Sequence, residues 1–245
     1  MSVASSEPWP QWRGHALVVG GGGIGMALVE ALGLRAPGLK VHLARRHPQQ
    51  SDELALDLGD DASLEQLAQL ASARLQPLRL VINTAGLLHG PTLQPEKRLS
   101  AVTRLQLEQS FAVNAFGPIL LARALELALP RDQASHFASL SARVGSIGDN
   151  QLGGWYAYRA AKAAQNQLLR TLAVEWARRL PQCCVSLLHP GTTATALSAP
   201  YRRPEASPDL FSPERAAHHL IDVLAGLSAA QSGGFWAWDG QPIPW

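Results

Sequence analysis

Tyr158 and Lys162 are a candidate pair for acid/base chemistry, because both side chains titrate and they are four positions apart in the sequence YRAAK. On a helix, residues at i and i+4 lie on the same face, so the phenol and the ammonium would be neighbours. A free phenol has a pKa of about 10 and is a poor base at neutral pH, but a nearby cation lowers that pKa. The pair therefore predicts a Tyr general acid/base. The alternative is a trivial contact between two exposed side chains.

The sequence VVGGGGIG, residues 18–25, joins an apolar stretch to a helical pattern through a cluster of glycines. Glycines let the backbone turn sharply and approach phosphates, and the first N–H groups of a helix attract anions. A strand, a glycine cluster and a helix in that order form the arrangement that holds a dinucleotide pyrophosphate. We therefore expect a nucleotide site here. The alternative is a flexible turn between strand and helix.

The basic pair Arg45 and Arg46 indicates which nucleotide the site accepts. A fold that binds NAD usually has an acidic residue about 20 residues after the glycines, whereas an Arg there accommodates the 2′-phosphate of NADP. Counting 20 from Gly25 gives Arg45, and no carboxylate follows until Asp52. Because Arg offers bidentate donors to a phosphate, the sequence favours NADP over NAD. The alternative is a solvated basic turn.

A scaffold for these residues is visible in the alternation of apolar runs and helical patterns. The alternation predicts an α/β fold with a Rossmann-type, doubly wound parallel sheet in three αβα layers, a single domain over residues 1–245. Residues 1–13 form an N-terminal extension, and residues 192–213, with four prolines, are the expected substrate loop. Strands are predicted at 15–20, 39–44, 54–57, 78–83, 136–140 and 184–188, and helices at 24–32, 63–75, 107–129 and 154–180.

Composition narrows the class of protein. The chain has 245 residues and a formal net charge of +2, too small to indicate a nucleic-acid or membrane surface. No apolar run approaches the ~20 residues of a membrane span. The two cysteines, Cys183 and Cys184, are adjacent and lack a CxxC or His pattern, so we expect small core side chains and no metal site. Reduced cysteines favour a cytoplasmic location.

Eight segments together resemble the short-chain dehydrogenase/reductase family over nearly the whole chain. They are VVGGGGIG (18–25), ARR (44–46), LDL (56–58), INTAG (82–86), FAVNAFGP (111–118), SLSARVGSI (139–147), YRAAK (158–162) and HPGTTAT (189–195). Within the family, GGWYAYRAAKAA and the ending GGFWAWDGQPIPW are similar to the branch that contains the C-factor and the Sniffer carbonyl reductase. The resemblance implies an oxidoreductase that uses NADP. We expect a small carbonyl or alcohol substrate and a homo-oligomer, either a dimer or a tetramer.

The resemblance also implies roles for individual residues. Tyr158 would protonate the carbonyl oxygen, Lys162 would hold the nicotinamide ribose and lower the pKa of Tyr158, and Asn114 would keep a water that connects Lys162 to solvent. Each position also has a simpler structural explanation, such as a cap, a turn or a polar group inside a helix. The residues implied in cofactor binding, besides Tyr158 and Lys162, are Gly20, Gly23, Ile24, Gly25, Arg45, Asp57, Leu58, Asn83, Ala85, Gly86, Pro190, Gly191, Thr193 and Thr195.

The sequence departs from the family pattern at two places. The glycine motif is one residue shorter than TGxxxGIG, which predicts a tighter phosphate loop. The catalytic Ser of the family lies three residues before a Gly, and counting back from Gly145 gives Ala142. Ser141 is the favoured substitute, and Ser139 and Ser146 are also close. Two functions follow: an active NADP-dependent oxidoreductase, or a nicotinamide-nucleotide-binding regulatory protein with little turnover.

Overall fold

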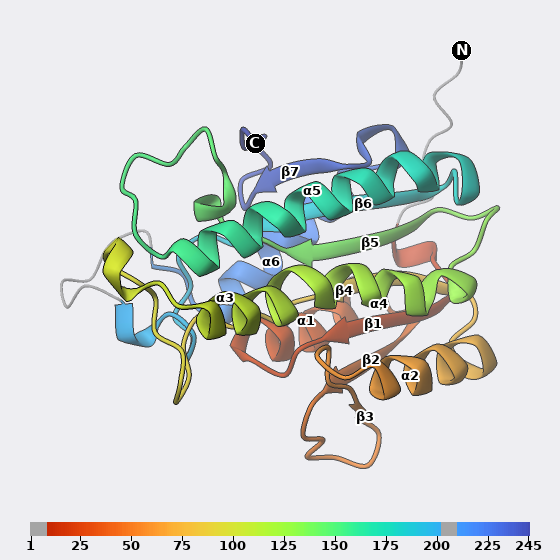
Figure 1. Ribbon diagram of the computed structural model, residues 1–245. Helices are drawn as coiled ribbons and strands as arrows, with labels where there is room; N and C mark the ends of the chain where they lie inside the picture. Colours follow the sequence, from red (N-terminus) through yellow and green to blue (C-terminus); the bar gives the residue numbers. More distant parts are fainter. Residues whose placement is uncertain (1–8, 202–209) are drawn as a thin grey trace.

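A computed structural model describes residues 9–201 and 210–245. Its centre is a seven-stranded parallel sheet in the order β3-β2-β1-β4-β5-β6-β7 (Figure 1). The order reverses between β1 and β4, and ligands of such sheets bind at the carboxyl ends of the strands beside this switch point. The strands are β1 (Gly14–Val19), β2 (Leu39–Arg45), β3 (Leu54–Ala55), β4 (Leu78–Asn83), β5 (Ser135–Leu140), β6 (Cys183–His189) and β7 (Gly234–Ala237).

Helices cover both faces of the sheet, which confirms the predicted Rossmann-type fold in three layers (Figure 1). One face is covered by α1 (Gly23–Arg35) and α6 (Pro213–Ala225), and the other by α2 (Asp61–Arg74), α3 (Arg104–Phe111), α4 (Gly117–Leu125) and α5 (Tyr156–Arg179). Successive strand residues point to opposite faces. Accordingly, Val81 packs into one core cluster while its neighbours Leu80 and Ile82 pack into the other. All six residues of β4 are buried, as the apolar run 78–83 predicts.

The helix predicted over 107–129 contains a π turn, Ala112–Phe116, between α3 and α4. A π turn inserts a wider loop into a helix and is frequent at functional sites. The whole stretch Arg104–Ala128 passes a length and hydropathy test for a membrane span, a finding that differs from the expectation of no such run. In the fold, this stretch packs against α2 and α5 on one face of the sheet.

Two elements lie outside those predicted from the sequence, namely α6 and β7. Ser212 caps α6 by accepting a hydrogen bond from the Arg215 N–H, and Pro213 occupies its first turn. The buried residues of α6 recur at helical spacing, which is the signal that identifies it: Ala216, Ala217, Leu220, Ile221 and Leu224. Strand β7 has only four residues and begins at the second glycine of the pair Gly233-Gly234, so its pattern is too short to separate from a turn.

The described part of the N-terminal extension, residues 9–13, packs against the core. The side chains of Trp9 and Trp12 are buried, and both rings lie 5.6 Å from the ring of His136 on β5. These residues therefore belong to the core on the α1 and α6 side. Within the expected substrate loop, residues 202–209 lie outside the described residues. Cys183 and Cys184 are free and buried in β6, as predicted.

Candidate active site

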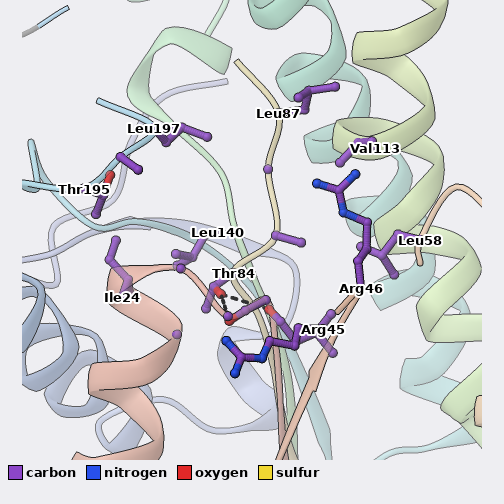
Figure 2. A pocket seen from close by; sticks show the side chains of 18 of the residues that line it. Ile24, Arg45, Arg46, Leu58, Thr84, Leu87, Val113, Leu140, Thr195 and Leu197 are labelled. Carbon is purple, nitrogen blue, oxygen red and sulfur yellow. Dashed lines mark hydrogen bonds between the residues drawn. The ribbon is translucent and has the colours of Figure 1, made fainter. Parts of the chain in front are cut away.

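A cavity of about 600 Å³ opens at the carboxyl ends of the strands, beside the switch point between β1 and β4 (Figure 2). Such edges of open α/β sheets are where ligands bind. The cavity brings together most of the predicted site residues, which come from seven separate segments of the sequence. Those that line it are Gly20, Gly23, Ile24, Gly25, Arg45, Asp57, Leu58, Ala85, Gly86, Ser141, Tyr158, Lys162, Pro190 and Thr195.

The loop between β1 and α1 leaves no room for side chains at two of its glycines. A Cβ on Gly25 would lie 1.9 Å from the Gly20 carbonyl oxygen, and Gly20 has φ +107°, a conformation that favours glycine. The Thr84 hydroxyl donates to the Val19 carbonyl at 2.9 Å and closes the loop against β4. Helix α1 begins at Gly23 with its first N–H groups at the cavity. The shortened loop thus retains the features that fit a phosphate: a close backbone and a helix N-terminus.

Tyr158 and Lys162 lie on the first turns of α5, and both side chains line the cavity. The Lys162 Nζ donates to the Leu140 carbonyl at 2.8 Å and to Gln165 Oε1 at 2.9 Å, and lies 5.8 Å from the centre of the Tyr158 ring. Burial lowers the pKa of Lys162 to about 7. Burial also raises the pKa of Tyr158 above its ordinary value, opposite to the direction predicted from the pair.

A buried chain of hydrogen bonds connects Lys162 to the end of β4. Gln165 is fully buried, and its Nε2 donates to the Ser139 hydroxyl at 2.9 Å. The same hydroxyl accepts from Asn83 Nδ2 at 2.9 Å, and Asn83 Oδ1 accepts from the Ala85 N–H. Asn83 therefore does not line the cavity. Its hydrogen bond to the Ala85 N–H holds in place the segment after β4, which does line it. Gln165 was not among the predicted site residues, although it lies three residues after Lys162 on α5, a spacing that indicates contact on a helix.

Ser141 lines the cavity, but its hydroxyl is already hydrogen-bonded. Its Oγ donates to Asn166 Oδ1 at 2.6 Å, and the residue is 4% exposed. Ser139 belongs to the buried chain of hydrogen bonds, and the Ser146 hydroxyl accepts from the Asp149 N–H at 3.2 Å. Of the three serines considered, Ser141 alone reaches the cavity, and it would have to exchange Asn166 for a substrate oxygen.

Asn114 lies in the π turn, buried behind the cavity wall rather than in it. Its Oδ1 accepts from the Leu87 N–H at 2.9 Å, and its Nδ2 donates to the Leu87 carbonyl at 2.7 Å and to the Ser110 hydroxyl. The neighbouring side chain of Val113 is the one that lines the cavity (Figure 2). Asn114 therefore fastens the loop after β4 to the helix layer.

The segment after β6 is divided between the cavity and the core. Pro190 and Thr195 line the cavity, whereas the Thr193 side chain is buried and its hydroxyl lies 3.4 Å from the Pro190 carbonyl oxygen. Gly191 turns the chain with φ +75° and packs against Phe211. Asp57 lines the cavity beside Leu58, and its Oδ1 accepts a hydrogen bond from the Gly59 N–H. Asp57 is therefore both a turn residue and a residue of the cavity wall.

The two arginines at the end of β2 differ in their surroundings. Arg45 lines the cavity as predicted, but its guanidinium forms an ion pair with Glu53, with NH2 2.7 Å from Oε1. Arg46 also lines the cavity, and its guanidinium extends past Leu58 toward Val113 (Figure 2). Glu53 was not among the predicted site residues, because it reaches Arg45 only by the folding back of the loop between them, eight residues along the chain.

Comparisons with known proteins agree with this geometry. A family model described as short chain dehydrogenase matches residues 14–206. The chain is 30% identical over 199 residues to 1-hydroxy-2-glutathionyl-2-methyl-3-butene dehydrogenase of Rhodococcus sp. (strain AD45), covering 79% of this chain and 80% of that protein. It is also 30% identical over 148 residues to C-signal of Myxococcus xanthus, covering 60% of this chain and 83% of that protein.

Solved structures share the fold over almost the full chain. The NADPH-bound carbonyl reductase from chicken fatty liver has a TM-score of 0.82 at 23% identity, and the carbonyl reductase Sniffer of D. melanogaster has 0.81 at 24%. Each match covers 96% of this chain and 100% of the other. The similarity to C-signal supports the branch predicted from the sequence. The chain belongs to the short-chain dehydrogenase family.

Proposed function

We propose that this protein reduces a carbonyl compound to an alcohol with NADPH, or catalyses the reverse, and that Tyr158 is its general acid/base. The observation that carries the proposal is the meeting of the Tyr158 and Lys162 side chains with the glycine loop in one cavity. A helix N-terminus at that loop fits a pyrophosphate, and Arg46, directly after β2, adds positive charge. The NADPH-bound carbonyl reductase with the same fold supports the choice of nucleotide.

In this mechanism the protein supplies the proton and fixes the geometry. A bound NADPH would supply the hydride that reduces the carbonyl carbon. Tyr158 Oη donates its proton to the carbonyl oxygen as the C=O double bond becomes a C–O single bond, leaving an alcohol and a phenolate. Lys162, as an ammonium on the same face of α5, stabilises that phenolate. Solvent then returns a proton to the tyrosine.

Burial of the pair is chemically useful to this cycle. Tyr158 is 9% exposed and Lys162 is 3% exposed, so charges interact more strongly here than in water. Burial keeps Tyr158 protonated, which makes it a proton donor before the reaction. The phenolate that follows is costly unless the ammonium approaches it, and Lys162 therefore has to shift from its present acceptors on Leu140 and Gln165.

The test is NADPH consumption with a panel of aldehydes, ketones and quinones. Tyr158→Phe removes the proton donor and should lower kcat/KM by at least about 100-fold, the usual contribution of general acid catalysis. Tyr156→Phe is the matched control, because Tyr156 lies on the same helix, outside this cavity and 41% exposed. It should keep activity within about twofold of the wild type.

The second candidate is a nicotinamide-nucleotide-binding regulatory protein with little turnover. The hydrogen bond from Ser141 to Asn166 favours it, because it leaves no hydroxyl at this position free to polarise a substrate. Similarity to C-signal is a further reason to consider it. Tight NADPH binding without turnover of any panel compound, and no effect of Tyr158→Phe, would support this candidate over the reductase.

A further inference from the structure

Glu53 is held at the edge of the candidate nucleotide site by four donors. Its Oε2 accepts from Arg45 Nε at 2.8 Å and from the N–H groups of Gln49 and Gln50, and its Oε1 accepts from Arg45 NH2 at 2.7 Å. The side chains of Glu53 and Arg45 are only 6% and 13% exposed. Two parallel hydrogen bonds between guanidinium and carboxylate are the strongest form of such a pair. The Arg45 guanidinium and the Gln49 N–H hold the pKa of Glu53 below its usual range, so the carboxylate is ionised at neutral pH.

The pairing removes most of the electrostatic value of Arg45 for an anion. The carboxylate neutralises the guanidinium and uses the edge formed by Nε and NH2, one of the two edges with which an Arg can bind a phosphate in a bidentate way. The rest of the Arg45 side chain packs on the glycine loop, where a Cβ on Gly21 would lie 2.4 Å from Arg45 Cδ. Arg45 is thus fixed as a wall of the site with its charge balanced.

Arg46 has the opposite character. It is exposed and lines the same cavity, and its guanidinium extends away from that of Arg45 (Figure 2). Within residues 9–201 and 210–245, Arg46 forms no ion pair. Its positive charge is therefore uncompensated, and its long side chain can turn toward a ligand without breaking a buried contact.

We propose that Glu53 is a specificity-determining residue of the nucleotide site, because it holds Arg45 in a buried ion pair and leaves Arg46 to bind the 2′-phosphate. The inference rests on the proposed use of NADP(H). In this proposal the preference for a 2′-phosphate depends on the combined charges of Arg45, Arg46 and Glu53 rather than on Arg45 alone. Glu53 limits that preference, since its negative charge opposes the phosphate, and Arg46 sustains it.

Calorimetric titration of NADPH and NADH into the purified chain tests this assignment, since the two differ only in the 2′-phosphate. Glu53→Gln releases the charge of Arg45 and should raise the ratio of the NADH Kd to the NADPH Kd on the order of tenfold, about the effect of one nearby charge. Asp52→Asn is the matched control: it removes the same charge one residue away, from an exposed side chain. It should change the ratio by less than about twofold.

Arg46→Ala provides an independent arm, because an exposed side chain can be truncated with little risk to folding. It should lower the ratio of Kd values by about tenfold or more while leaving the NADH Kd unchanged. The inference is overturned if Glu53→Gln changes the ratio no more than Asp52→Asn, or if Arg46→Ala leaves it unchanged. If Glu53→Gln does not fold, Arg46→Ala decides. A wild-type chain that binds neither nucleotide would instead overturn the proposed function itself.

Discussion

At the scale of single residues, the candidate site combines groups whose ordinary properties are altered by burial. The Lys162 ammonium is held by the Leu140 carbonyl and by Gln165, with a pKa lowered to about 7 by burial. The Gln165 side chain does not ionise, but it is one of the two hydrogen-bond acceptors that stabilise the charged form of the buried Lys162. The positive charge on Lys162 that stabilises the Tyr158 phenolate therefore depends in part on the side-chain amide of Gln165.

Gln165→Leu should lower the pKa of Lys162 below about 7, because it removes a hydrogen-bond acceptor of the charged form. If turnover needs the ammonium, kcat/KM is lost as pH rises through that pKa, so the high-pH limb of the profile should shift to lower pH by about one unit. Gln165→Glu adds a negative charge and should shift the limb upward. Gln167→Leu, an exposed position on the same helix, is the control and should leave the profile in place.

The Gln165 prediction is contradicted if both Gln165 variants shift the limb in the same direction, or if neither differs from Gln167→Leu. A purely structural role would change kcat/KM at all pH values without moving the limb.

Residue-scale features that depend on local spacing were visible in the sequence. Tyr158 and Lys162 are on one helical face because they are four residues apart, and the glycine cluster lies directly between a strand and a helix. Glu53 was not visible, because its contact with Arg45 depends on how a loop folds back. The contact of Gln165 with Lys162 could have been inferred from their i,i+3 spacing, but its hydrogen bond to Ser139 in the buried layer could not. Spacing does not determine which side chain a loop turns inward.

At the scale of elements, the site lies at the carboxyl ends of the strands, and side-chain hydrogen bonds hold the loops in position at this edge of the sheet. Six predicted strands and four helical patterns are present, with boundaries within a few residues, because apolar runs and helical periodicity follow burial directly. The π turn was not predictable in this way, since it leaves the helical pattern of 107–129 almost unchanged. Its role is to place Asn114 against the Leu87 backbone.

Asn114→Ala should lower the free energy of unfolding by about 2 kcal/mol, because it removes the hydrogen-bond partner of both the partly buried backbone N–H and the partly buried carbonyl of Leu87. Ser110→Ala removes only one of the three hydrogen bonds of Asn114 and should cost about 1 kcal/mol. Urea unfolding of both variants measures the difference. Equal losses would show that the Leu87 backbone finds other partners and that the π turn does not fasten this loop.

At the scale of the whole molecule, the sheet is buried between two core clusters, and the N-terminal tryptophans extend one of them over β5. His136 is buried in this region, and its Nδ1 has no hydrogen-bond partner among the described residues. Burial, with a smaller contribution from the charge of Arg79, lowers the pKa of His136 to about 4. This packing was not predicted, because the two tryptophans lie before the first recognisable strand.

The low pKa of His136 makes the stability of the fold depend on pH. Between pH 6.5 and about 4 the unfolded chain binds a proton that the folded chain excludes, so stability is lost as pH falls through this window. The loss is up to about 3 kcal/mol at 1.36 kcal/mol per pKa unit. His136→Phe keeps a ring against Trp12 and should reduce the drop in unfolding free energy between pH 7 and 4.5 by about 2 kcal/mol.

Chemical denaturation of wild type and His136→Phe at the two pH values checks this difference. The pKa of His189 is also lowered to about 4 by burial, and His189 remains in both proteins, so the comparison isolates His136. Equal drops in the two proteins would mean that His136 does not control the acid sensitivity of this fold.

The most direct measurement of the central claim is transfer of deuterium from NADPH labelled on its nicotinamide ring to the carbonyl carbon of a panel compound. The product alcohol is detected by mass spectrometry. The wild-type chain should produce the deuterated alcohol, Tyr156→Phe should match it, and Tyr158→Phe should reduce its yield by at least about 100-fold in the same time. Binding of NADPH without any deuterated alcohol, or equal yields from wild type and Tyr158→Phe, would contradict a reductase that uses Tyr158 as its proton donor.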